Sequence, residues 1–167
     1  YCVTDTIVAY NNIFTSGTTG HGTYLHINAS HNIITNNTFD IKGDDAIGTS
    51  LYRSAHNNTL ENNIFNISGS WVGEASPAIS LSDNTTNNII HNNTIITNGT
   101  SSYGIHLVTN GFNNTVTNNK INTTGKNSPA IIATDTSTDF MFQNNTIDTT
   151  GLNSTGILLY GIAHRHE

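Results

Sequence analysis

The sequence predicts an all-β protein, a parallel β-helix or β-solenoid of about six coils, with about 26 residues and three short strands in each coil. Three observations indicate this fold. Pairs of asparagines recur about every 26 residues, short apolar patches recur at fixed distances from them, and the composition favours strands and turns over helices. Asn and Thr each occur 27 times among 167 residues, and both are weak helix formers.

The asparagine pairs mark the period of the repeat. An apolar residue stands two positions after the second Asn of each pair, beginning with Phe14, and a glycine follows four residues later in all copies but the first. A second column, a small residue followed by Ile, begins with Ala46-Ile47 and continues through Gly156-Ile157. The six pairs are Asn11-Asn12, Asn36-Asn37, Asn62-Asn63, Asn92-Asn93, Asn118-Asn119 and Asn144-Asn145.

Each period contains three apolar patches separated by turn-forming Asn and Gly. Apolar and polar residues alternate within a patch, as in Ile105-His106-Leu107, which predicts a strand with one inward face. Such short patches cannot pair with one another in a meander, but each can pair with the same patch one period later, so that coils stack about 4.8 Å apart. We expect one solenoid domain over residues 1–167; the start at Tyr1 without Met indicates a processed product or a segment of a longer repeat protein.

Alternation along the strands places two columns of asparagine inside the solenoid, at its bends. Buried amides without partners would be costly, but stacked identical amides can donate to one neighbouring coil and accept from the other. Asn also tolerates the left-handed backbone of a tight bend. The predicted ladders consist of Asn32, Asn58, Asn88 and Asn114 in one column and Asn37, Asn63, Asn93, Asn119 and Asn145 in the other.

The recurring N-N-[TI]-[IVLF] and [GA]-I-x-[LA] blocks resemble the repeats of pectate-lyase-like right-handed parallel β-helix proteins. They most resemble the Asn/Thr-rich repeats of adhesin-like and other cell-surface proteins of methanogenic archaea. The resemblance covers roughly residues 6 to 160. It implies a right-handed, single-stranded β-helix and an extracellular location. Because this scaffold carries lyases, hydrolases, tailspikes, adhesins and envelope proteins alike, the resemblance indicates fold far more than function.

Charge and composition exclude several classes of protein. Five basic residues and a net charge of −6 give no footprint for nucleic acid or anionic lipid. No apolar run approaches the roughly 20 residues of a membrane span. Cys2 is the only cysteine, which excludes an internal disulfide.

The longest departure from the repeat is a candidate carbohydrate-contact edge. Ile79 follows Gly69 by ten positions, whereas the equivalent step is six positions in the last three coils. Aromatic rings beside carboxylates are typical of sugar sites. The alternative is that the loop tryptophan covers the coil edge and that the acids are solvated. The expected edge comprises Trp71 and Glu74 in the loop, Asp44 and Asp45 one coil earlier, and Tyr103 one coil later.

No catalytic residue, metal site or cofactor is predicted. Gly43-Asp44-Asp45-Ala46-Ile47 resembles the paired-aspartate segment of polygalacturonases, and Gly20-His21-Gly22 resembles their G-H-G element. In that family G-H-G follows the aspartates, whereas here it precedes them, and the N-T-D-G and R-I-K elements are missing. Histidines such as His31, His56 and His91 fall in different columns, so no metal-ligand set is expected.

The sequon N-x-[ST] occurs eleven times. Asn36, Asn92 and Asn144 are expected to face outward and would be available acceptors for glycans in an exported protein.

Two functions remain. The first is a non-enzymatic, extracellular structural solenoid of a cell envelope, sheath, filament or adhesin stalk, whose ends continue into further repeats or pair with other copies. The alternative is a carbohydrate-binding or carbohydrate-active β-helix protein whose partners include cell-surface glycans.

Overall fold

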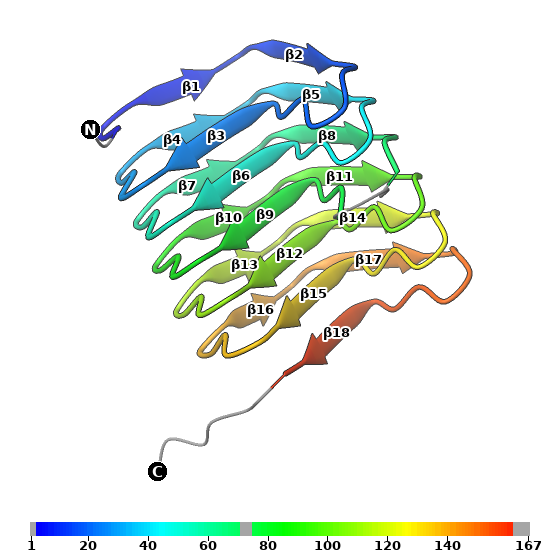
Figure 1. Cartoon of the computed structure of the whole chain (residues 1–167). Helices are drawn as coiled ribbons and strands as arrows, with labels where there is room; N and C mark the ends of the chain where they lie inside the picture. The colour runs from blue at the N-terminus through cyan, green and yellow to red at the C-terminus, as the bar shows by residue number, and fades with distance from the viewer. Residues whose placement is uncertain (1–2, 71–74, 162–167) are drawn as a thin grey trace.

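A computed structural model describes residues 3–70 and 75–161 and shows a parallel β-solenoid whose first and last strands, β1 and β18, lie at opposite ends of the stack (Figure 1). Three parallel sheets of six strands each run the length of the solenoid, and every coil contributes one strand to each sheet. No helix occurs in the described residues, and hence none that is long and apolar enough to cross a membrane. The predicted fold class is confirmed.

The three sheets are named here after their first strands. The β1 sheet contains β1 (Ile7–Ala9), β4 (Ile33–Thr35), β7 (Thr59–Glu61), β10 (Ile89–His91), β13 (Thr115–Thr117) and β16 (Met141–Gln143). The β2 sheet contains β2 (Asn12–Thr15), β5 (Thr38–Ile41), β8 (Ile64–Ile67), β11 (Thr94–Thr97), β14 (Lys120–Thr123) and β17 (Thr146–Thr149). The β3 sheet contains β3 (Thr23–His26), β6 (Thr49–Tyr52), β9 (Ile79–Ser82), β12 (Ile105–Val108), β15 (Ile131–Thr134) and β18 (Ile157–Tyr160).

The core is made of equivalent residues stacked on one another. Leu60, Ile90 and Val116 occupy one inward row and are fully buried. The rings of Phe39 and Phe65 stack in another row, with centroids 4.6 Å apart. Each inward side chain therefore packs against its own counterpart in the next coil, which makes the period of the sequence the period of the core.

Two asparagine ladders line the bends on either side of the β1 sheet. The main-chain N–H and Nδ2 of Asn58 both donate to Oδ1 of Asn88, each at 3.0 Å, and Nδ2 also donates to the carbonyl of Ala29. The same pattern joins Asn63 to Asn93. The four asparagines of the first predicted column are buried, as are those of the second except Asn145, which is half-buried in the last coil.

The left-handed backbone lies one residue before each ladder asparagine. Asn36 and Asn92, which precede Asn37 and Asn93, have φ of 54° and 52°. The ladder residues themselves do not adopt this conformation, because none of them has a positive φ. The first Asn of a pair turns the chain and the second forms the ladder.

In the first coil the same two roles are taken by residues one position earlier than predicted. Asn11, not Asn12, donates to Oδ1 of Asn37, and Tyr10 takes the left-handed position with φ 58°. The apolar column of the first coil consequently begins at Ile13, which pairs with Phe39. Phe14, expected in that column, is 60% exposed and lies under Lys42, whose Nζ is 5.0 Å from the ring centroid.

The register of the second coil also differs from the prediction. Thr49 pairs with Ile79, so the strand begins two residues after the predicted Ala46-Ile47 block. Ile47 instead precedes the strand and receives the main-chain N–H of Gly22 on its carbonyl. The small residue stacked on Ala78 is Gly48, whose N–H donates to the carbonyl of Pro77.

A third bend, before the β3 sheet, contains two features that the asparagine pattern does not reveal. Ser102 donates its N–H to Oγ of Ser128, which in turn donates its N–H to Oγ of Ser154, forming a short serine ladder. A column of glycines stacks nearby, and a Cβ added at Gly99 would overlap the carbonyl oxygen of Gly69. The coils approach so closely here that only glycine fits.

Candidate functional site

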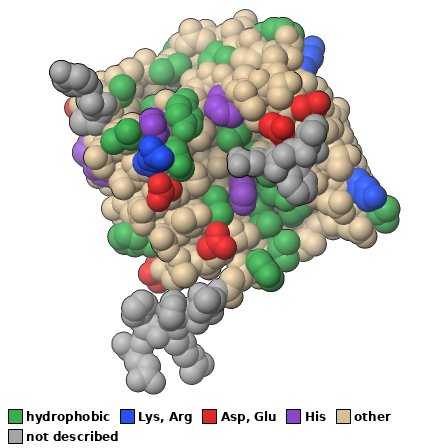
Figure 2. Space-filling model, viewed as in Figure 1, with side chains coloured by type: hydrophobic (Ala, Val, Ile, Leu, Met, Phe, Trp, Pro, Cys, Tyr) green, Lys and Arg blue, Asp and Glu red, His purple; other side chains and the backbone are tan. Residues whose placement is uncertain are grey.

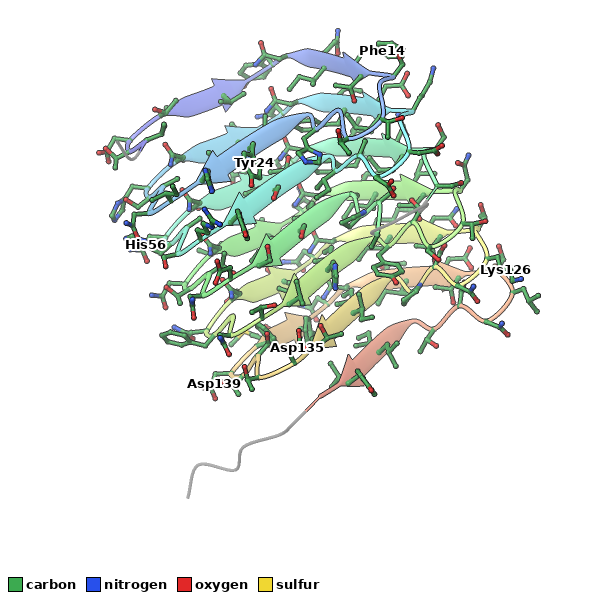
Figure 3. All side chains as sticks on the ribbon, viewed as in Figure 1. Phe14, Tyr24, His56, Lys126, Asp135 and Asp139 are labelled. Carbon is green, nitrogen blue, oxygen red and sulfur yellow. The ribbon has the colours of Figure 1, made fainter. Side chains whose placement is uncertain are left out.

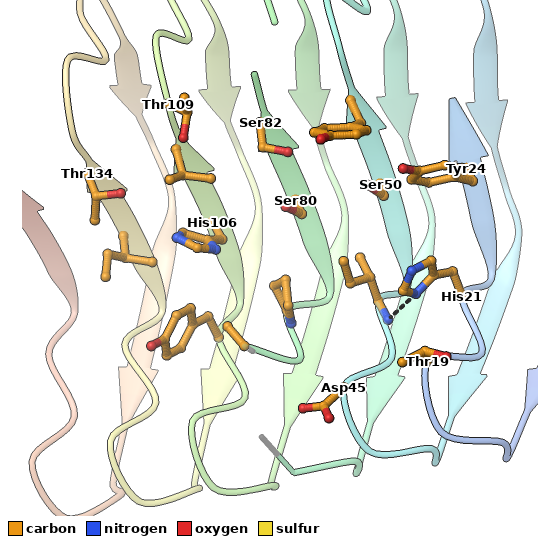
Figure 4. Close-up of a pocket in the computed structure, with 17 residues that line it drawn as sticks. Thr19, His21, Tyr24, Asp45, Ser50, Ser80, Ser82, His106, Thr109 and Thr134 are labelled. Atoms are coloured by element: carbon orange, nitrogen blue, oxygen red, sulfur yellow. Dashed lines mark hydrogen bonds between the residues drawn. The ribbon is translucent and has the colours of Figure 1, made fainter. Parts of the chain in front are cut away.

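The candidate site is a groove of about 870 Å³ on the outer face of the β3 sheet (Figure 4). It is lined by residues of the strands β3, β6, β9, β12 and β15 and of the bend that precedes these strands. In the space-filling view, several histidine and acidic side chains are visible on the face shown (Figure 2). The strand β3 contributes Tyr24, and Asp135 lies at the turn after β15 (Figure 3).

One wall of the groove is a stack of aromatic rings from the first two coils. The rings of Tyr24 and Tyr52 line the groove and stack with centroids 6.2 Å apart. The ring of His26 packs against both, with centroid distances of 5.1 Å and 5.3 Å. Period-two alternation places all three side chains on the outer face of the sheet. Burial and the neighbouring Tyr52 raise the pKa of Tyr24, so its phenol is neutral and can donate a hydrogen bond.

The floor of the groove consists of small hydroxyl side chains. Ser50 and Ser80 pair across β6 and β9 and point outward, yet they are only 3% and 6% exposed. Their short side chains leave a depression between the taller residues of neighbouring coils. The sheet is thus hollowed where two consecutive coils carry serine in place of an aromatic or aliphatic residue.

The opposite wall is formed by Tyr103 and His106 in the fourth coil. Their rings meet edge to face, with centroids 5.3 Å apart. Burial lowers the pKa of His106 to about 4, against a smaller opposing influence of Asp135, and burial raises the pKa of Tyr103. Both side chains are therefore neutral at neutral pH.

His21 closes one end of the groove beside Tyr24. Its Nδ1 accepts the main-chain N–H of Ile47 at 3.1 Å, which leaves the proton of the neutral ring on Nε2. Burial lowers the pKa of His21. Asp45 is the only carboxylate among the described lining residues, which include no Lys or Arg.

The predicted carbohydrate edge is only partly assembled at this groove. Asp45 and Tyr103 line it, whereas the Oδ1 of Asp44 accepts the main-chain N–H of Ser70 at 2.8 Å in the neighbouring turn. Trp71 and Glu74 lie outside the described residues. The residues that sequence reasoning missed are Tyr24, Tyr52, Ser50, Ser80, His21 and His106. A signal existed, because Tyr24, Ser50, Ser80 and His106 are equivalent positions of successive strands.

The described residues hold no group of three or more His, Cys, Asp or Glu that could ligate a metal ion. His31 and His56 belong to different columns, but their rings lie 6.3 Å apart because those columns are adjacent at the bend.

The three proposed glycan acceptors lie at exposed left-handed turns between the β1 and β2 sheets. Asn36 donates from Nδ2 to Oγ1 of Thr35, and Asn92 donates from Nδ2 to Oδ1 of Asn62. The Asn144 side chain is likewise exposed, in the last of these turns.

Comparison with known proteins agrees with the architecture. A family model described as a right-handed β-helix region matches residues 6–147, which is most of the chain. No curated protein and no solved structure shows a significant match. The length of the family match and the stack of parallel coils lead to one conclusion: the chain belongs to the right-handed β-helix family.

Proposed function

We propose that the protein is a non-enzymatic structural β-solenoid of a cell surface, part of an envelope layer, sheath, filament or adhesin stalk, and that its coils continue into those of a neighbouring module. The observation that carries this proposal is the state of the two end coils. Each presents the bonding pattern of an interior coil without its partner.

The two ends are complementary in their hydrogen bonding. Within the described residues, the Oδ1 of Asn11 receives no donor, and the main-chain N–H of Asn145 has no acceptor. Interior ladder residues use these same two groups to bond to each other. A coil stacked on either end would therefore extend the second ladder without any new kind of contact.

The last coil also presents apolar surface. Leu159 occupies the inward row of Leu81 and Leu107, which are fully buried, yet it is 67% exposed. Covering such a side chain is worth about 1.5–3 kcal/mol. This gain favours association of the end coil with a further coil.

The location at a cell surface has separate support. Eleven sequons, including the exposed Asn36, Asn92 and Asn144, suit a glycoprotein, and the repeat blocks resemble those of archaeal adhesin-like surface proteins. Protease treatment and labelling of intact source cells tests this. Labelling of the protein on intact cells is expected, and protection until the cells are lysed would contradict an extracellular location.

Assembly is tested by sedimentation velocity and electron microscopy of the purified chain. We expect concentration-dependent oligomers or filaments, and we expect Leu159→Lys to dissociate them because it places a charge in the end contact. Leu152→Lys is the matched control, since Leu152 is equally exposed but lies in a turn. A monomer at all concentrations, or assembly that survives Leu159→Lys, would contradict association through the ends.

A further inference from the structure

We propose that the groove on the β3 sheet is a binding site for an uncharged saccharide, whose C–H faces stack on tyrosine rings and whose hydroxyls bond to the floor. This site is distinct from the contacts that carry the structural role proposed above. Its lining lies on the outer face of the sheet and reaches Tyr24 in the first coil, but it includes neither Asn11 nor Leu159.

The shape of the groove suits an elongated ligand. A volume of about 870 Å³ lies within the range of small-molecule sites. The lining residues span five coils, from Tyr24 to Thr134, or roughly 19 Å at about 4.8 Å per coil step. The groove is therefore long in the direction of the solenoid axis and suits a chain of several sugar units.

The lining combines the two kinds of group that a pyranose requires. Aromatic walls stand at both ends of the depression, Tyr24 and Tyr52 on one side and Tyr103 on the other. Between them lies a set of hydroxyls, each of which can both donate and accept, as sugar hydroxyls do. These hydroxyls belong to Ser50, Ser80 and Ser82, and the lining also includes the hydroxyls of Thr19 in the first coil and of Thr109 and Thr134 in the fourth and fifth coils.

The charges of the groove select against acidic sugars. The rings of His21 and His106 are neutral at neutral pH, because burial lowers the pKa of each. The described lining includes no Lys or Arg and carries the carboxylate of Asp45. A uronate carboxylate would therefore find no cation in the described lining to pair with, and its desolvation would be uncompensated.

The nearest cation does not alter this conclusion. Arg53 lies over the ring of Tyr52, with Cζ 5.0 Å from the centroid. Its Nε is 3.8 Å from a carboxylate oxygen of Asp83. The guanidinium is thus engaged with an acid and an aromatic face, and it does not line the groove.

The experiment is a glycan array containing neutral and uronate-bearing oligosaccharides, followed by calorimetric titration of the full chain with the strongest neutral ligand and its acidic counterpart. We expect binding of neutral glycans and at least tenfold weaker binding of acidic ones. Tyr103→Ala is expected to weaken binding about tenfold, whereas Tyr103→Phe retains the ring and most of the affinity.

Two further variants locate the site. Ser80→Phe fills the depression from an outward position and is expected to abolish binding. Tyr160→Ala is the matched control, because Tyr160 lies on the same outer face at β18 but outside this groove. Circular dichroism and the thermal midpoint establish that each variant is folded.

Several outcomes would overturn the proposal. These are binding of no glycan, stronger binding of acidic than neutral glycans, or unchanged binding in folded Ser80→Phe. Preferential binding of apolar aromatic compounds or peptides would assign the groove to another ligand and would also reject it. None of these results bears on assembly through the ends, so failure of this site and failure of the structural proposal are distinguishable.

Discussion

The interior of the solenoid and the outer face of its β3 sheet differ sharply in regularity. Inside, equivalent positions carry the same residue in coil after coil, as Asn58, Asn88 and Asn114 do. Outside, the equivalent row of the β3 sheet reads Tyr24, Ser50, Ser80, His106, Ile132 and Leu158. Both rows consist of equivalent positions in successive coils, but only the inward row keeps the same residue from coil to coil.

The difference follows from what each side chain contacts. An inward residue packs against and hydrogen-bonds to its own counterpart, so a change in one coil disrupts two neighbours. An outward residue has solvent on one side and can change alone. Residues that could bind a ligand are therefore expected where an outward row departs from the period, as it does at the groove.

The largest expected effect comes from breaking an interior ladder. Asn88→Ala removes the acceptor of the Asn58 N–H and of one of the two Nδ2 hydrogens of Asn58, and it leaves both of these buried donor hydrogens without a partner. At about 1–3 kcal/mol for each unsatisfied group, we expect a loss of roughly 4 kcal/mol in the free energy of unfolding. Chemical denaturation followed by circular dichroism measures it.

Asn92→Ala is the control for this variant, because Asn92 is exposed at a turn four residues away. Its left-handed φ of 52° disfavours alanine, and we expect a loss of about 1 kcal/mol. Equal losses in the two variants would contradict the distinction between ladder and turn asparagines.

The glycine column is expected to be the next most sensitive feature. A methyl group at Gly99 overlaps the carbonyl oxygen of Gly69 and forces the coils apart, whereas one at Gly17 meets nothing within 4 Å. We expect Gly99→Ala to lower the free energy of unfolding by about 3 kcal/mol and Gly17→Ala by less than about 1 kcal/mol. Thermal unfolding of the two variants provides the test, and similar midpoints would be the contrary result.

Acid is expected to destabilise the outer face through His106. Its pKa in the folded protein is about 4, below the 6.5 of an unperturbed histidine, so the unfolded chain takes up the proton first. This contribution to stability is complete above pH 6.5 and is lost as the pH falls towards 4. Full loss corresponds to roughly 3 kcal/mol.

Urea titrations at several pH values measure this dependence, and His106→Gln is expected to remove most of it. Part remains in that variant because burial also lowers the pKa of His21. An unchanged pH profile in His106→Gln would assign the acid sensitivity elsewhere.

The serine ladder is expected to give the smallest effect of the series. Ser128→Ala removes the acceptor of the Ser102 N–H, but leaves a single buried donor without a partner. We expect a loss of about 2 kcal/mol in the free energy of unfolding, about half that of Asn88→Ala. Denaturation of the two variants side by side compares a hydroxyl rung with an amide rung, and an equal or larger loss for serine would reverse this order.

The fold and the asparagine columns could be predicted because they depend on recurrence, which is visible in the sequence. Where two residues were equally plausible, recurrence was misleading. Asn11-Asn12 looks like the other pairs, yet Tyr10 takes the left-handed position and shifts the register by one. The serine ladder was not predicted from the sequence because its column is not serine throughout. The positions equivalent to Ser102, Ser128 and Ser154 are occupied by Gly20 and Ala46 in the first two coils.

The groove could not be predicted in the same way, because it results from differences between coils. The groove can be recognised only when the side-chain sizes of Tyr24, Ser50 and His106 are compared along one row. That comparison requires the register of the second coil to be known. A strand that began at Ala46-Ile47 would have Gly48 in this row, whereas the structure has Ser50 there. Asp45 and Tyr103 were identified because they flank the longest loop.

The four-residue insertion in the third coil has a consequence for how this protein can evolve. Asn63 and Asn93 are 30 residues apart in place of the usual 26, yet their ladder bonds are 3.0 Å and 3.1 Å long, as elsewhere. The stack tolerates added sequence at a bend without a change of register. Selection can therefore lengthen loops one residue at a time, whereas duplication or loss of coils must proceed in whole units. Related proteins would therefore differ in chain length by whole coils, and in their binding residues by single substitutions or short loop insertions.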